Sequence, residues 1–446
     1  MVRSKFLSAV NRPTDPAGLA VLRILYGLLT CFSTVRFIMN GWLEAFYVTP
    51  DFHFKFLGAE WAVVPSVDVL YGLMLLMIVC STFITLGLFF RVATGIYVAC
   101  FTYIELLDVA NYLNHYYLAS LLGLLLLCTP ADAAYSLRGT KGPIARWPYL
   151  LLRAQLAIVY FYAAAAKFNT DWLMHGQPLG IWLNARTEVP VIGSLFQYPE
   201  AALAMSWGGF LYDSTIVFWL LWARTRALAY AGVVIFHVMT GVLFNIGIFP
   251  WIMIIATTIF FQPAWPRRFT GSLSLAGTLR GQLSTPTVPL LILWLTFQIA
   301  WPARSFLYEG PVNWHEQGMR FSWKVMVREK SGDVTFRVRH RARQREELVP
   351  PARYLTSAQE REMSGQPDLI LQLANHIAEE YRTKGMEDVE VRADAWVSWN
   401  GRVPARLIDP KIDLTTVQDD LTPAAWILPA PSTEPVQLTP RRITTP

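Results

Sequence analysis

The sequence predicts an α-helical polytopic membrane domain of about nine transmembrane helices, followed by a smaller α+β extracytoplasmic domain. Three observations predict this fold class. Of the 446 residues, 54% are hydrophobic and only 16% are charged, whereas about a quarter of the residues of a typical soluble domain are charged. Long apolar runs dominate residues 18–301, and charged residues become frequent from Arg304 onward. Basic residues within the apolar region gather in alternate loops, as they do in proteins that cross a membrane repeatedly.

The change in composition near residue 302 divides the chain. Residues 1–302 are predicted to form the transmembrane helical domain, and residues 303–428 the soluble α+β domain. Residues 429–446 are rich in Pro and Thr and are expected to be disordered. Apolar runs predict spans near residues 19–39, 68–90, 92–107, 114–130, 148–167, 206–223, 227–247, 248–262 and 288–302. The first run is long enough to span, so we expect it to remain in the protein rather than act as a cleaved signal peptide.

The distribution of Lys and Arg predicts the orientation in the membrane. With a cytoplasmic N-terminus, the outer loops carry Lys55, Lys167 and Arg186. The inner segments carry many more basic residues, namely Arg3, Lys5, Arg12, Arg91, Arg138, Lys141, Arg146, Arg224, Arg226, Arg267, Arg268 and Arg280. This asymmetry predicts a C-terminal domain on the periplasmic, extracellular or lumenal side. Because the basic clusters behave as topology signals, the net charge of +6 does not indicate nucleic-acid binding, and membrane lipid is the expected partner.

The outer domain shows both strand and helix patterns. Apolar residues alternate over residues 321–327 and again over 334–338, and Ser331-Gly332-Asp333 between them predicts the turn of a β-hairpin. Residues 368–384 have helical periodicity. Residues 389–399 are predicted to form a strand, which an Asn-Gly dipeptide ends in a tight turn.

No cysteine or metal-ligand framework is apparent. The four cysteines, Cys31, Cys80, Cys100 and Cys128, lie within or at the ends of apolar segments, so neither a disulfide framework nor a zinc spacing is available. Asp171 and His175 lie one helical turn apart, but two ligands are weak evidence for a metal. We therefore expect no metal in this protein.

Ionisable residues inside apolar segments are the first candidates for function, because a polar group in hydrocarbon is costly unless it is satisfied. Lys167 ends an apolar helix in which Ala163–Ala166 leave room for another group to approach. Arg153, Tyr160 and Lys167 are spaced seven residues apart, so they share roughly one helix face. This face could line a polar cavity. Alternatively, Lys167 could extend its ammonium to the membrane surface and Arg153 could anchor the helix at the inner interface.

Further polar residues map to the same region. Asn111, Asn114 and His115 occupy positions i, i+3 and i+4, which puts them on one face near the outer surface. An interfacial helix cap is the alternative for these three. His237 lies in mid-span, where a neighbouring hydroxyl or carbonyl could satisfy it, and Asp213 lies in a span and needs a partner or a wet cavity. A site in the outer half of the membrane could meet both a lipid-soluble molecule and the outer domain.

Several short motifs occur in a family-specific order. The run YFYAAAAKFNTDW begins at Tyr160, LNHYYLASLL at Leu113 and FHVMTGVLFNIGIFPWIM at Phe236. In the outer domain, RFSWKVMV begins at Arg320 and IDPKIDL at Ile408. The first run resembles the segment that carries the catalytic lysine in the vitamin K-dependent gamma-glutamyl carboxylase family. The others resemble that family's Asn-His segment, its later histidine segment and two strands of its outer domain.

The resemblance covers roughly residues 15–430 and implies an enzyme of the lyase type. A lysine would remove a proton from reduced vitamin K, the hydroquinone, and molecular oxygen would then add. The oxygenated quinone would take a γ-proton from a substrate glutamate, the carbanion would capture carbon dioxide, and the quinone would leave as its epoxide. The implied cofactor is thus vitamin K hydroquinone with oxygen and carbon dioxide, and the implied partner is a glutamate-containing peptide or protein.

The resemblance and the polar residues together predict a site. Its members are the catalytic residues Lys167, His115 and Asn114, the quinone-binding residues His237, Arg153 and Tyr160, and the substrate-binding residues Arg328, Lys330, Arg406 and Lys411. The resemblance implies that Lys167 is the first base, and that Asn114 and His115 hold the quinone oxygens. Animal members of the family have a histidine and an arginine where this chain has Arg328 and Lys330.

Two alternatives stay open. The shorter, cysteine-free outer domain suggests a prokaryotic relative, and such a protein could epoxidise a quinone without carboxylating a protein. A non-catalytic quinone- or lipid-binding membrane protein, or a transporter, is the alternative from another class. A transporter is disfavoured because the sequence shows neither internal repeats nor interrupted helices.

Overall fold

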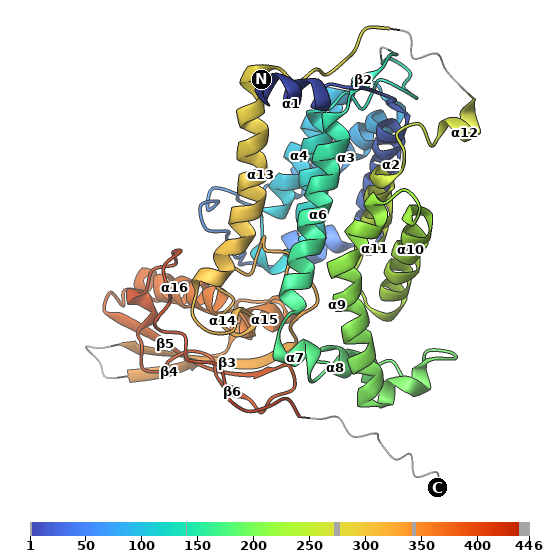
Figure 1. Ribbon diagram of the computed structural model, residues 1–446. Coiled ribbons are helices and arrows are strands. Elements are labelled where there is room, and N and C mark those ends of the chain that lie inside the picture. The colour runs from blue at the N-terminus through green and yellow to red at the C-terminus, as the bar shows by residue number, and fades with distance from the viewer. Residues whose placement is uncertain (1, 140, 272–276, 341–344, 437–446) are drawn as a thin grey trace.

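The computed structural model describes residues 2–139, 141–271, 277–340 and 345–436. It consists of a bundle of long helices with a smaller sheet-containing domain at the end opposite the N-terminus (Figure 1). The long helices are α2 (Ala17–Met39), α3 (Val67–Leu86), α4 (Phe90–Glu105), α5 (Asn114–Leu127), α6 (Trp147–Lys167), α9 (Pro199–Leu221), α10 (Arg226–Leu243), α11 (Phe249–Thr257) and α13 (Val288–Ala303). The shorter elements of the bundle are α1 (Val2–Val10), α7 (Thr170–Leu173), α8 (Leu179–Asn184), α12 (Arg267–Thr270), β1 (Pro13–Thr14) and β2 (Ile144–Ala145). α14 (Val312–His315) belongs to the smaller domain, since Trp314 is buried in that domain's apolar cluster.

Each of the nine predicted spans coincides with a described helix, but the count of about nine spans is not confirmed. Five described helical stretches are long and apolar enough to cross a membrane: Ala17–Met39, Val67–Leu86, Trp147–Lys167, Arg226–Leu243 and Thr285–Leu307. α4, α5 and α11 have 16, 14 and 9 residues, short of the roughly 20 that a perpendicular span needs. The number of helices is therefore a poor guide to the number of complete crossings.

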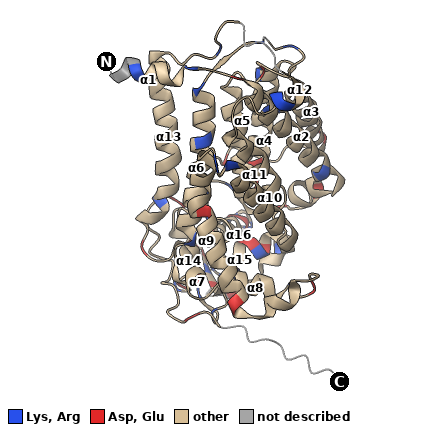
Figure 2. Ribbon diagram, turned by 45° about the vertical axis from the view of Figure 1, so that its right-hand side comes forward, with Lys and Arg blue, Asp and Glu red and all other residues tan. Residues whose placement is uncertain are grey.

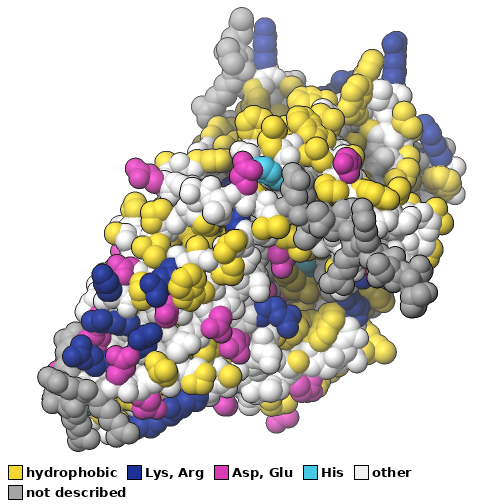
Figure 3. All heavy atoms as spheres, turned by 90° about the horizontal axis from the view of Figure 1, so that it is seen from below, with side chains coloured by type: hydrophobic (Ala, Val, Ile, Leu, Met, Phe, Trp, Pro, Cys, Tyr) yellow, Lys and Arg dark blue, Asp and Glu magenta, His cyan; other side chains and the backbone are white. Residues whose placement is uncertain are grey.

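The surface of the bundle suits a lipid environment. The helices run for long stretches without a charged residue (Figure 2). Large apolar side chains are exposed on their outer faces, among them Phe32, Leu75, Phe218, Leu228 and Leu293. Seen from the sheet-domain end, charged side chains gather over the sheet domain, whereas hydrophobic side chains predominate over the helices (Figure 3). Such extensive exposed apolar surface is what a bilayer covers.

The C-terminal domain, named the outer domain after its predicted side of the membrane, is an antiparallel sheet packed against helices. The strands follow the order β4-β3-β5-β6, with β3 (Lys330–His340), β4 (Arg345–Val349), β5 (Val389–Trp399) and β6 (Ala405–Arg406). Its helices are α15 (Ser357–Ser364) and α16 (Pro367–Thr383). The predicted helix over residues 368–384 and the predicted strand over 389–399 are confirmed. Asn400 and Gly401 both have positive φ, at 49° and 81°, as the predicted tight turn requires.

The predicted hairpin with its turn at Ser331-Gly332-Asp333 is wrong. These three residues lie inside β3 and pair with Ser398, Val397 and Trp396 of β5. Gly332 is required by close packing, since a Cβ there would lie 2.9 Å from the carbonyl oxygen of Ser364. The alternating apolar residues 321–327 form a loop rather than a strand.

The core of the outer domain includes residues that precede residue 303 in the sequence. Phe54 and Val109, from two loops of the helical region, are buried in the same apolar cluster as β3, β5 and α16. Gln359 of α15 donates a buried hydrogen bond to Asp108 Oδ2 at 2.9 Å. Residues 429–436 are part of the segment expected to be disordered. They contact the turn after β5, where Arg402 Nε donates to the Thr433 carbonyl oxygen at 2.7 Å. Residues 437–446 lie outside the described part of the chain.

Candidate functional site

A cleft of about 1400 Å³ lies between the helix bundle and the outer domain. One wall is formed by the start of α5 and the loop between α10 and α11, and the other by residues 316–330 and the end of α15. Its lining is mixed, with aromatic side chains toward the bundle and several basic side chains toward the outer domain. Such a cleft can take a ligand that is partly apolar and partly anionic.

Asn114 and His115 are the first two residues of α5 and line this cleft. The Asn114 Oδ1 accepts a hydrogen bond from the Tyr112 hydroxyl at 3.0 Å. His115 is buried, and its Nε2 has no hydrogen-bond partner among the described residues. Because the N-terminus of a helix carries partial positive charge, this corner of the cleft favours an oxygen that bears negative charge.

His237 of α10 belongs to a buried polar group with two tyrosines. The Tyr160 hydroxyl lies 3.4 Å from His237 Nε2 and 3.3 Å from the Tyr212 hydroxyl. The Nδ1 of His237 is buried and has no partner among the described residues. The predicted neighbours Tyr160 and His237 therefore do lie together, and one ring nitrogen is left to bind something else.

Phe249 connects the two histidines. Its ring centroid lies 6.0 Å from that of His115 and 5.6 Å from that of His237. Phe249 also lines the cleft, whereas His237 lies behind it. The two histidines thus flank one aromatic side chain at the inner wall of the cleft.

Lys167 forms an ion pair with Asp213. Its Nζ lies 2.8 Å from Asp213 Oδ2, and each side chain is 8% exposed. The same ammonium lies 5.3 Å from the Trp172 ring centroid and 3.3 Å from the Ala163 carbonyl oxygen. Gly209 precedes Asp213 by one helical turn and lies beside both Lys167 and Trp172, since a Cβ there would be 3.6 Å from the Trp172 ring and 4.0 Å from Lys167 Cε. The burial of this pair argues against a lysine that extends to the membrane surface.

An apolar cluster connects the surroundings of this pair to the wall of the cleft. Ala166 and Trp172, which flank Lys167, belong to the same buried cluster as Leu243, Phe244 and Met319. The last three line the cleft. Lys167 therefore lies close behind the inner wall and is shielded from water, which strengthens its interaction with Asp213.

Arg153 is not brought to this site. Its guanidinium donates to the carbonyl oxygens of Ile259 at 2.9 Å and Phe261 at 3.0 Å, where the helical turn that follows α11 ends. Carbonyl oxygens at the end of a helix have no partner within the helix, so Arg153 supplies the hydrogen-bond donors that these groups lack. The structure thus places Arg153 with the helix end and apart from Tyr160 and Lys167, although the three share one face of α6.

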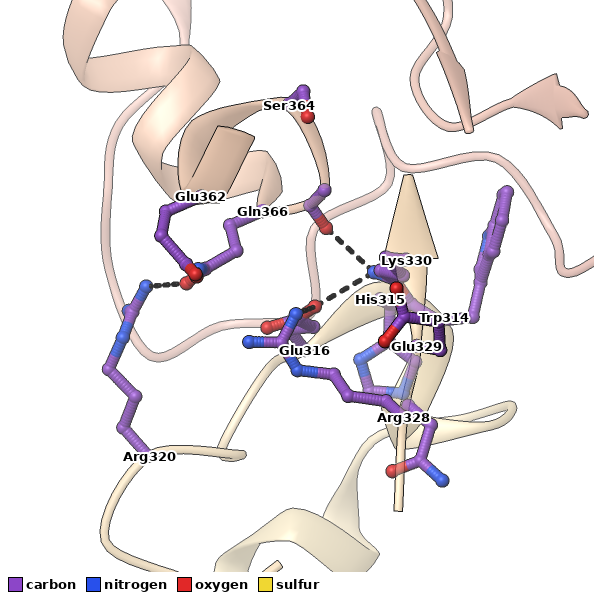
Figure 4. Close-up of polar contacts among 12 residues, drawn as sticks. Trp314, His315, Glu316, Arg320, Arg328, Glu329, Lys330, Glu362, Ser364 and Gln366 are labelled. Atoms are coloured by element: carbon purple, nitrogen blue, oxygen red, sulfur yellow. Dashed lines mark hydrogen bonds and ion pairs between the residues drawn. The ribbon is translucent and has the colours of Figure 1, made fainter. Parts of the chain in front are cut away.

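The outer-domain residues Arg328 and Lys330 share one carboxylate. Arg328 Nη1 and Lys330 Nζ lie 2.8 Å and 2.9 Å from Glu316 Oε1 (Figure 4). Lys330 also donates to the carbonyl oxygens of Trp314 at 2.5 Å and Gly365 at 2.7 Å. Burial lowers the pKa of Lys330 to about 8, against the opposing effect of Glu316. Lys330 is saturated by protein groups, so its role is to hold the wall of the cleft together.

Arg406 and Lys411 lie outside the cleft. Arg406 is exposed, lies over the Trp396 ring and pairs with Asp394 at 3.1 Å. Lys411 is exposed at the surface. Neither residue lines the cleft that Arg328 and Lys330 share, so these two pairs of predicted substrate-binding residues are not brought together.

A second buried ion pair joins α7, which directly follows α6, to the outer domain. Arg402, just after the Asn400-Gly401 turn, holds both carboxylate oxygens of Asp171, at 2.5 and 2.7 Å. Asn400 Nδ2 donates to the same carboxylate at 2.8 Å. Asp171 follows Lys167 by four residues, so this contact fixes the end of α6 against the outer domain. The sequence motif contains Asp171, but nothing in its spacing identifies Arg402 as its partner.

The replacement Arg402→Ala should destabilise the protein by about 3–5 kcal/mol, because it leaves the Asp171 carboxylate buried without a cation. Thermal unfolding of the detergent-purified protein measures the effect. Arg406→Ala is the matched control, since an exposed ion pair contributes about 1 kcal/mol or less. Equal stabilities for the two variants would show that the Asp171–Arg402 contact does not join the domains.

The fold and the site define a class of protein: a helical membrane protein with an outer sheet domain and a polar site between the two. Two family models match this chain. The HTTM domain matches residues 11–265, and the lumenal domain of vitamin K-dependent gamma-carboxylase matches residues 284–433. No solved structure matches the chain. The chain belongs to the vitamin K-dependent gamma-glutamyl carboxylase family, and membership supports a vitamin K-dependent, carboxylase-like function.

Proposed function

We propose that this chain is a membrane-embedded enzyme that oxygenates reduced vitamin K to its epoxide and uses that reaction to carboxylate a glutamate. The observation that carries the proposal is the buried Lys167–Asp213 pair, which lies behind a cleft shared by the helix bundle and the outer domain. A structural ion pair would account for the contact but not for the nearby His237, whose ring lies 6.1 Å from that of Tyr212, the neighbour of Asp213, and whose Nδ1 is buried without a partner among the described residues.

The cleft fits a quinone. His115 Nε2 and His237 Nδ1 are buried and free among the described residues, and both rings flank Phe249. His115, which lines the cleft, suits one quinone oxygen, and the aromatic side chains of the cleft suit the quinone ring. When bound, the reduced quinone supplies the electrons with which molecular oxygen yields a base strong enough to remove a glutamate γ-proton, so that carbon dioxide can add.

The protein's own contribution is proton transfer and charge stabilisation. Lys167 and Asp213 can form either an ammonium–carboxylate pair or a neutral amine–acid pair, and both pairs are uncharged overall. In the neutral pair the Lys167 amine can accept a further proton, so we infer that this form of the pair acts as the base. His115 at the N-terminus of α5 would stabilise the negative oxygen that proton removal creates.

Turnover by the purified protein tests the proposal. Reduced vitamin K and oxygen should give the epoxide, measured by chromatography, and a glutamate peptide should incorporate labelled carbon dioxide. Epoxide formation without incorporation would support a quinone epoxidase that does not carboxylate that peptide. Quinone binding without epoxide would support a non-catalytic quinone-binding protein and would refute the proposal.

We also propose that the N-terminus is cytoplasmic and the sheet domain lies outside, as the distribution of Lys and Arg indicates. In a variant without the four native cysteines, a membrane-impermeant maleimide should label Thr383→Cys, an exposed position, in intact cells. It should label Arg91→Cys only after the cells are permeabilised. The reverse pattern would invert the topology and place the cleft on the cytoplasmic side.

A further inference from the structure

One buried cation of the cleft has no acidic partner among the described residues. Lys324 lines the cleft between the bundle and the outer domain and is 8% exposed. Its Nζ lies 5.0 Å from the ring centroid of Phe306, and no described carboxylate pairs with it. Burying an ammonium without an anion is energetically unfavourable, so the presence of Lys324 at this position calls for an explanation.

Three neighbouring cations of the cleft differ from Lys324 in this respect. Arg328 and Lys330 are both held by Glu316. Arg320, on the same loop, pairs with Asp368 and donates to Gln366. Figure 4 shows the Glu316 carboxylate beside the Arg328 guanidinium and joined to Lys330. The protein therefore supplies its own carboxylates to these three residues and leaves Lys324 without one.

The loop backbone holds Lys324 in place by an unfavourable conformation. Trp323 and Met326 have positive φ, at 59° and 56°, which non-glycine residues rarely adopt. Trp323 is 1% exposed and stacks on Tyr117 of α5, with ring centroids 5.0 Å apart. The ring fixes the loop against the bundle, and the residue that follows faces the cleft. Backbone strain of this kind is commonly found where a side chain must be positioned for binding.

We propose that Lys324 binds the side-chain carboxylate of the substrate glutamate. This proposal rests on the function proposed above and names a residue for substrate recognition. A carboxylate entering the cleft would supply the anion that Lys324 lacks, through a charge-assisted hydrogen bond. Arg328, whose side chain is 26% exposed, lies on the same wall and can contribute a second donor without leaving Glu316.

Binding can be measured without any quinone or turnover. The probe is a short apolar peptide with one central glutamate, and the matched peptide has glutamine at that position. Wild-type protein should prefer the glutamate peptide, and Lys324→Gln should bind it at least about tenfold more weakly, the loss expected for one charge-assisted hydrogen bond. Lys384→Gln, which changes an exposed lysine far from the cleft, should bind as wild type does.

The pH dependence of binding adds a second readout. Burial lowers the pKa of Lys324 to about 8. Only the ammonium binds a carboxylate, so wild-type affinity should be constant below pH 8 and fall as the pH rises above it. Lys324→Arg should keep its affinity through this range, because a guanidinium stays protonated.

Stability separates a binding role from a structural one. Lys324→Gln removes a buried cation without a partner, so its Tm should equal or exceed that of the wild type. Lys330→Gln removes a saturated cation and should lower the Tm. Any of three results would overturn the proposal. The wild type could bind the two peptides equally, Lys324→Gln could bind the glutamate peptide as tightly as the wild type does, or Lys324→Gln could have a Tm as low as that of Lys330→Gln. Because these assays need no epoxide, a failure here is distinct from a failure of the proposed reaction.

Discussion

Lys167→Arg should fold as the wild type does and lose epoxide formation by at least about 100-fold, the effect typical of a missing general base. Arginine can keep the ion pair with Asp213, so the variant retains the buried contact that stabilises α6 against α9. Its guanidinium stays protonated at any physiological pH and cannot accept a proton. The rate of epoxide formation by purified protein, with unfolding temperature measured in parallel, gives the result.

Lys167→Ala tests the same role in a different way. It should lose epoxide formation equally, and a small primary amine added to the solution should restore part of the rate, more so at higher pH, where more amine is neutral. Removal of the buried lysine side chain, beside Ala163 and Gly209, leaves space for such a molecule. Full activity of Lys167→Arg would end the base hypothesis, and failure of every amine to affect Lys167→Ala would then agree with that result.

Asp213→Asn should reduce epoxide formation by about 100-fold as well. The amide is similar in size to the carboxylate and can still accept a hydrogen bond from Lys167, but it cannot hold the charge or the proton that the pair shares. The variant should also be less stable by about 3–5 kcal/mol, because Lys167 is left buried without its anion. Activity at saturating quinone and thermal unfolding measure the two effects.

A double replacement separates stability from activity. Lys167→Met with Asp213→Leu removes both charges and fills their space with apolar groups, so stability should recover to about that of the wild type. Activity should stay absent. Wild-type turnover by Asp213→Asn would show that Asp213 only holds the helices together, and the proton-sharing role would have to be abandoned.

The sequence predicted the helices well, because a bilayer imposes length and hydrophobicity on each segment and these can be counted along the chain. It also marked Asp213 as a residue that needs a partner. It could not identify Lys167 as that partner, since the pairing depends on how α6 packs against α9. The same limit applies to Asp171, whose partner Arg402 lies 231 residues away.

The failed predictions have physical causes as well. Alternation over residues 321–327 indicates a strand only when the apolar side chains face one sheet. Here Phe321 and Trp323 contact Tyr117 of α5 instead, with the backbone in a left-handed conformation. Arg406 is near the site motifs in sequence but is exposed and pairs with Asp394 outside the cleft. Proximity in sequence is thus a weak indicator of membership in a site that two domains form.

The burial of Phe54 and Val109 in the outer-domain core bears on how the protein is made. Both side chains leave the ribosome long before β3 and β5, which begin at Lys330 and Val389, have been synthesised. Until those strands exist, the two loops present apolar groups at the membrane surface that only the final third of the chain can cover. Completion of the outer domain therefore depends on segments of the chain that are made much earlier, and residues 303–428 expressed alone would lack part of their own interior.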